Sequence, residues 1–124
     1  MSWGLWSILV AGLLPYVATA CAKWGFKGYD NNNPRAWLAH QTGFRARGHA
    51  AQLNSFESFP FFAAAILVAT WRSANPEWVD AFATAYIVAR IAYIYLYVRD
   101  CATYRSIAWL MGILSIVGLF VIAS

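Results

Sequence analysis

Two charged residues, Glu57 and Arg90, interrupt long apolar stretches of the sequence. A carboxylate or a guanidinium near the middle of a membrane helix costs roughly 2.5 to 3.5 kcal/mol on insertion scales. Membrane proteins accept that cost where the charges face each other or a water-filled cavity, and such positions are candidates for a functional site. Glu57 and Arg90 are therefore the first residues whose chemistry needs an explanation.

Polar side chains recur around each charge at helical spacing, because residues three, four and seven apart share one face of an α-helix. The first stripe consists of Arg47, Asn54 and Glu57, and the second consists of Tyr86, Arg90, Tyr93 and Tyr97. At a rise of about 1.5 Å per residue, Glu57 and Arg90 lie at similar depths, roughly 10 and 12 Å inside their spans. We predict that Glu57 and Arg90 form an ion pair, with the bidentate geometry that arginine favours.

Two interpretations of this polar face remain open. A structural ion pair could fix the register of two helices, with the tyrosines as ordinary core. Alternatively, the face forms a pocket for a small anion that carries both donors and acceptors. The pocket explains why Gln52 and Arg105 also lie toward the same end of the predicted spans as this polar face. Structural pairing alone does not require them there.

The composition predicts an all-α integral membrane protein with one domain over residues 1–124. Of the residues, 61% are hydrophobic and only 11% are charged, whereas a soluble domain carries about 25% charged residues. Four segments approach the length of about 20 residues that a membrane helix needs: residues 3–22, 50–71, 78–98 and 106–123. The net charge of +4 is spread over short loops, so nucleic acid is not an expected partner. No cluster of metal-ligating residues at suitable spacing is present.

The connecting loops predict the orientation of the four spans. Residues 23–49 and 99–105 contain seven lysines and arginines, and residues 72–77 contain one. Short basic loops stay in the cytoplasm, so both termini are expected outside.

Asn33 and Pro34 are typical of a helix start, and they predict a short surface helix that continues through Gln41. This helix is either part of a structured loop or a lid over the site. Cys21 is interpreted as small apolar filler in a reducing compartment.

Two stretches resemble the signatures of the MAPEG family, the membrane-associated proteins of eicosanoid and glutathione metabolism. Residues 45–60 resemble the second-helix signature, whose core is Asn54, Glu57 and Pro60 at successive steps of three. The second signature is matched by a run on the third span and by the start of the fourth: Arg90, Tyr93, Tyr97, Arg105 and Ser106. The two stretches together cover about half of the chain.

The resemblance implies a four-helix bundle that assembles as a homotrimer, with glutathione bound between neighbouring subunits and open to the cytoplasm. By position, Asn54 and Glu57 are expected to hold the polar groups of the tripeptide, and Arg90 to brace Glu57. Tyr93 and Tyr97 are expected to contact its backbone or carboxylates. Further expected binding residues are Arg47 and Gln52, and the expected catalytic residues are Arg105, which activates the thiol, and Ser106, a second thiol donor.

The implied function is a membrane-bound glutathione-dependent transferase or peroxidase. A guanidinium beside the thiol favours the nucleophilic thiolate, which attacks a lipophilic electrophile that arrives from the bilayer. The short chain is typical of a bacterial inner membrane. Eukaryotic members usually carry an arginine where this chain has Ala50, so a non-catalytic MAPEG-fold binding or regulatory protein is an alternative. A small four-helix exporter is a third, against which the uncharged first span and the biased loops argue.

Overall fold

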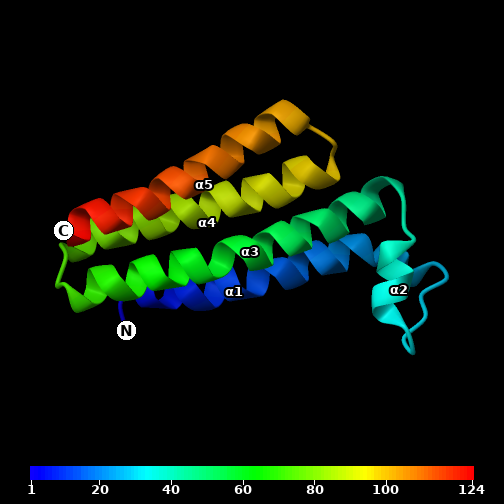
Figure 1. Cartoon of the computed structure of the whole chain (residues 1–124), viewed down its shortest axis with the longest axis horizontal. Coiled ribbons are helices and arrows are strands. Elements are labelled where there is room, and N and C mark those ends of the chain that lie inside the picture. The colour runs from blue at the N-terminus through cyan, green and yellow to red at the C-terminus, as the bar shows by residue number, and fades with distance from the viewer.

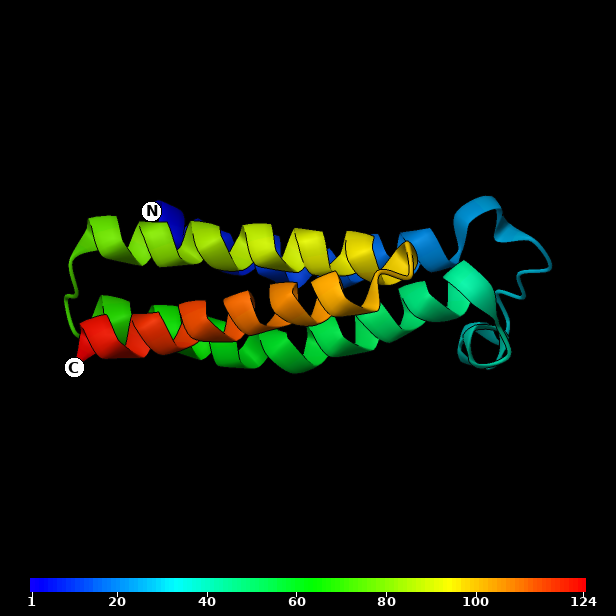
Figure 2. The same cartoon turned by 90° about the horizontal axis from the view of Figure 1, so that it is seen from above.

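The computed structural model describes residues 1–124 as a bundle of long antiparallel helices (Figure 1). The elements in chain order are α1 (Trp3–Ala22), the 3-10 turn η1 (Trp24–Phe26), α2 (Pro34–Ala39), α3 (Gly43–Trp71), α4 (Pro76–Val98) and α5 (Ala102–Ala123). The most extensive contacts are those of α1 with α3 and of α4 with α5. The two termini lie at one end of the bundle, and the short helix α2 lies at the other (Figures 1 and 2).

The four long helices correspond to the four predicted spans, and each is long and apolar enough to cross a membrane. The bounds of α1 agree with the prediction, but α3 begins at Gly43 rather than at residue 50. Hydropathy marks only the apolar part of a helix, and the polar turns from Gly43 to His49 continue α3 beyond it. The starts of α4 and α5 are likewise two and four residues earlier than predicted.

Glycines bring the paired helices into close contact. A Cβ atom on Gly48 of α3 would lie 2.9 Å from the backbone nitrogen of Ala22 on α1. On the other pair, a Cβ atom on Gly118 of α5 would overlap the ring of Phe82 on α4. Small residues at helix contacts are typical of membrane bundles, whose helices associate through close packing rather than through the hydrophobic effect.

The end of the bundle that carries the termini is closed by hydrogen bonds between helices. The Asp80 side chain accepts a bond from the backbone nitrogen of Gly4 at 2.8 Å, and the Trp3 indole donates to the Thr84 hydroxyl at 2.8 Å. Arg72 donates from Nε to the carbonyl of Ala123 at 3.2 Å. We refer to this as the terminal end, and to the opposite end, beside α2, as the loop end.

Candidate functional site

Arg90 lies at the centre of the polar face that the sequence predicts. It is only 2% exposed, and its Nη2 donates to Asn54 Oδ1 at 2.9 Å and to Ser55 Oγ at 3.1 Å, both on α3. Its guanidinium also lies 4.2 Å from the centre of the Tyr93 ring. Neutral oxygens and an aromatic face therefore hold this buried cation, and no carboxylate of the same chain neutralises it.

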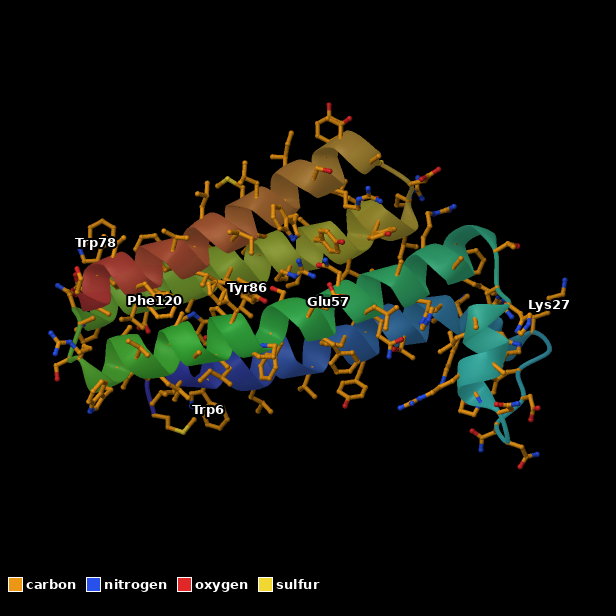
Figure 3. The ribbon with its side chains drawn as sticks, in the orientation of Figure 1. Trp6, Lys27, Glu57, Trp78, Tyr86 and Phe120 are labelled. Carbon is orange, nitrogen blue, oxygen red and sulfur yellow. The ribbon has the colours of Figure 1, made fainter.

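The predicted ion pair between Glu57 and Arg90 is wrong within the subunit. Glu57 is exposed on the outside of α3. Along the bundle it lies nearer to α2 than the buried Tyr86 does (Figure 3). Glu57 follows Asn54 by three residues and is therefore rotated by about 60° from it around the helix axis. That rotation carries Glu57 away from the core and onto a surface where its neighbours one turn away, Leu53 and Phe61, are also exposed.

A row of aromatic rings connects Arg90 to Arg105. The rings of Tyr93 and Tyr97 meet edge to face, with 5.6 Å between their centres. The Arg105 guanidinium of α5 lies 4.3 Å from the centre of the Tyr97 ring. A cation over a tyrosine face is attracted by the ring quadrupole. Arg105 makes no side-chain hydrogen bond, so all of its donors remain free for a ligand.

The structure thus brings together five of the predicted site residues, contributed by three helices. They are Asn54 of α3, Arg90, Tyr93 and Tyr97 of α4, and Arg105 of α5. We call this group the Arg90–Arg105 cluster. Glu57 lies one turn beyond Asn54 along α3, on its exposed side.

Two serines belong to this face although the sequence analysis missed them. Ser55 is buried and accepts one of the two hydrogen bonds of Arg90. Ser58 bonds the hydroxyl of Tyr86 at 2.6 Å, and the Tyr86 ring stacks on Phe62 with 3.9 Å between the centres. Ser58 follows Asn54 by four residues, so the helical spacing used for the larger polar residues also predicts its position.

Besides Glu57, three predicted site residues lie outside the Arg90–Arg105 cluster. Arg47 donates from Nε to the carbonyl of Val98 at 3.0 Å and so caps the last turn of α4. Ser106 is exposed and donates to the carbonyl of Ala102 at 3.1 Å. Gln52 comes two positions before Asn54, which places the two side chains about 160° apart around α3.

Gln52 belongs to a second polar surface, on the far side of α3. Its Oε1 lies 3.3 Å from Nδ1 of His49. The two side chains line a hollow between α2 and α3, together with Arg35, Leu38, Leu53 and Phe56. We call this hollow the Gln52 face. It offers a base, an imidazole and an amide, which are groups that suit an anionic or peptide ligand.

Comparison with models of known protein families matches residues 3–124 to the MAPEG family. The matched range contains all four long helices, the Arg90–Arg105 cluster and the Gln52 face. No curated protein and no solved structure matches the chain.

Proposed function

The chain belongs to the MAPEG family, and we propose that it is a membrane-bound glutathione-dependent transferase or peroxidase that acts on lipophilic electrophiles. Members of this family are mostly glutathione-dependent enzymes. The four long apolar helices and the family together indicate an integral membrane protein. The observation that carries the proposal is the guanidinium of Arg105 at the end of the tyrosine row, which makes no hydrogen bond within the chain.

In the proposed mechanism, Arg105 holds the sulfur of glutathione as a thiolate. A cation beside a thiol lowers its pKa and so raises the fraction of the nucleophilic form. The thiolate donates its electron pair to the electrophilic carbon of the second substrate, and a carbon–sulfur bond forms. In a substitution, the bond from that carbon to the leaving group breaks, and the leaving group takes the bonding electron pair. In an addition, the product takes up a proton instead. Ser106 is a second candidate donor, once its hydroxyl is released from Ala102.

Asn54, Tyr93 and Tyr97 bind the tripeptide in this proposal. The phenol and amide groups supply donors and acceptors for its peptide bonds and carboxylates. Arg90 positions Asn54 and Tyr93 from behind, because it contacts both and is itself buried. Glu57 offers a carboxylate for the ammonium group of glutathione.

We further propose that a complete site requires two subunits of a homotrimer. Glu57 carries its charge on an outer face where neighbouring side chains are apolar, and a bilayer would oppose that exposure. The Gln52 face and the Arg90–Arg105 cluster lie on opposite sides of α3, so one subunit cannot apply both to one ligand. A head-to-tail ring places the Gln52 face of one subunit against the cluster of the next. In that ring, Arg35 of one subunit and Arg105 of the next lie on the two sides of the same ligand.

The loop end is proposed to face the cytoplasm, with both termini outside and the protein in a bacterial inner membrane. Most of the lysines and arginines lie at the loop end, in the segments that join α1 to α3 and α4 to α5. Short basic loops remain on the cytoplasmic side. Glutathione would then enter from the cytoplasm, while the second substrate and surrounding lipids reach the protein through the bilayer.

The thermal unfolding midpoint of the detergent-purified protein tests the proposal. It is measured with and without glutathione, with oxidised glutathione and glutathione sulfonate alongside. A ligand at a hundredfold excess over its dissociation constant stabilises the native state by about 2.7 kcal/mol. The proposal requires a rise with glutathione and with the sulfonate. An unchanged midpoint with both ligands would contradict it.

Co-expression of two inactive variants tests whether the site lies between subunits. Gln52→Ala removes one side of each site, and Asn54→Ala removes the other. In mixed trimers, an intact Asn54 of one chain meets an intact Gln52 of the next, so about a quarter of all sites are restored. If both residues act within one subunit, co-expression restores none.

The alternative is a MAPEG-fold protein that binds without catalysis, and Ala50 is the observation that favours it. Ala50 is rotated by about 40° from Asn54, so an arginine at this position would border the Arg90–Arg105 cluster. Arg47, one turn earlier, already caps α4. Binding of glutathione without a thiolate absorption band, and without turnover of an aryl halide, would favour this alternative. Membership of the MAPEG family disfavours the exporter.

A further inference from the structure

A narrow groove follows the surface between α1 and α4 toward the loop end. Leu14, Val17 and Cys21 form its α1 side, and Ile91 and Ile94 belong to its α4 side. Arg99, at the end of α4, is the only charged residue that lines it. The groove therefore combines an apolar floor with a single base at its loop end.

This groove is separate from the Arg90–Arg105 cluster, although both use α4. Ile91, Ile94 and Val98 share one face of α4, and Arg90, Tyr93 and Tyr97 share another. At 3.6 residues per turn the two faces are about 100° apart. Nothing in the proposed glutathione chemistry uses the groove, so its shape and charge need their own explanation.

The loop end of the groove is rich in positive charge. Arg99 is exposed, and its side chain makes neither a hydrogen bond nor an ion pair, although Asp100 follows it in the chain. Two further arginines of α3 reach the last carbonyls of the helices that form the groove. Arg45 donates to Ala22 on α1 at 3.0 Å, and Arg47 donates to Val98 on α4 at 3.0 Å. Arg99 therefore lies at the end of the groove where two further guanidinium groups bond the last carbonyls of α1 and α4.

We propose that the groove binds an anionic phospholipid, with one acyl chain along α1 and α4 and its phosphate at Arg99. An acyl chain matches the apolar floor formed by Leu14, Val17, Ile91 and Ile94. Unpaired basic residues at the end of a membrane groove select a negatively charged headgroup. This lipid site goes beyond the glutathione function and does not depend on it.

The test measures lipid binding to the intact detergent-purified protein by native mass spectrometry and thermal unfolding. Phosphatidylglycerol and phosphatidylcholine with identical acyl chains are compared. We expect phosphatidylglycerol to bind more tightly and to raise the unfolding midpoint further. Arg99→Gln should reduce its affinity about fivefold, the effect of one basic residue near an anionic surface. Lys27→Gln removes an exposed base of the same end that does not line the groove, and should retain the preference.

A second pair of variants locates the acyl chain. Ile91→Trp fills the groove and should abolish tight binding of phosphatidylglycerol. Leu110→Trp places the same indole on α5, outside the groove, and should have no effect. Equal affinity for the two lipids overturns the proposal, as does a preference that survives Arg99→Gln or an effect of Leu110→Trp equal to that of Ile91→Trp. An oleate that displaces phosphatidylglycerol with higher affinity also overturns it, in favour of a fatty-acid site. None of these outcomes bears on glutathione binding, which is measured separately.

Discussion

The two ends of the bundle treat their polar side chains differently. At the terminal end, Asp80 accepts a backbone hydrogen bond from Gly4, and the Trp3 indole bonds Thr84. At the loop end, Arg90 is buried with two neutral acceptors and a tyrosine face, and Arg105 contacts only the ring of Tyr97. Both ends are polar, but Asp80 and the Trp3 indole are paired within the chain, whereas the Arg105 side chain makes no hydrogen bond.

This difference separates polar groups that hold the fold from polar groups that can serve a ligand. The groups at the terminal end are satisfied from within the chain, so removing one costs a single hydrogen bond. At the loop end, the Arg105 guanidinium lies over the Tyr97 ring, which takes none of its N–H donors. Preorganised donors of this kind are the means by which enzymes stabilise developing or bound negative charge.

The largest expected effect is that of Arg105→Ala on activity. Loss of one preorganised donor typically reduces turnover by about a hundredfold or more. The variant should also lose the ultraviolet thiolate band of bound glutathione. Its unfolding midpoint should remain close to that of the wild type, because the Arg105 side chain makes no hydrogen bond within the chain and lies over the Tyr97 ring. A retained band would transfer the activating role to another base, with Arg47 the first candidate.

Arg90→Lys is expected to destabilise the fold by about 2 kcal/mol, the scale of one hydrogen bond to a charged group. A lysine keeps the charge but lacks the planar guanidinium, which lies over the Tyr93 ring while its Nη2 bonds Asn54 and Ser55. Arg72→Lys at the terminal end is the matched control, because its single bond to Ala123 suits an ammonium as well. Denaturant titration in mixed micelles compares the two. Equal losses would remove the distinction between the two ends.

Glu57→Gln is expected to weaken glutathione binding about tenfold, which corresponds to 1.4 kcal/mol for a lost charge contact with the ligand. The fold should not be destabilised, since Glu57 is exposed and pairs with no base of its own subunit. Calorimetric titration gives the affinity, and thermal unfolding gives the stability. A loss of stability as large as that of Arg90→Lys would mean that Glu57 is part of the buried network after all.

Trp3→Phe should give the smallest effect, a loss of about 0.5 kcal/mol, because it removes one partly solvated hydrogen bond to Thr84. Glutathione affinity should be unchanged, since Thr84 lies nearer to the terminal end of α4 than Arg90, Tyr93 and Tyr97 do. A change in glutathione affinity with Trp3→Phe would show that the two ends are coupled.

Hydropathy and helical spacing predicted the four spans and the cluster from Asn54 to Arg105, because both depend on local sequence. The spacing argument failed for Glu57. Asn54 and Glu57 are three residues apart and therefore differ by about 60° around α3, and this rotation is enough to turn Glu57 from the core to the outer surface. The same argument also grouped Gln52 with Asn54 by depth alone, although the two point to opposite sides of α3. Which side chain reaches which helix depends on packing, and Gly48 against Ala22 sets that contact for α1 and α3.

The length of α3 has a consequence for how the protein sits in bilayers of different thickness. At 1.5 Å per residue, its 29 residues extend about 44 Å, whereas α1, α4 and α5 extend about 30 to 35 Å, close to one hydrocarbon core. A thinner or thicker bilayer must be matched by the tilt of those three helices. The overhang of α3, which carries Gly43 to His49, extends beyond the hydrocarbon core in either case, so the loop end beside α2 stays in the aqueous phase.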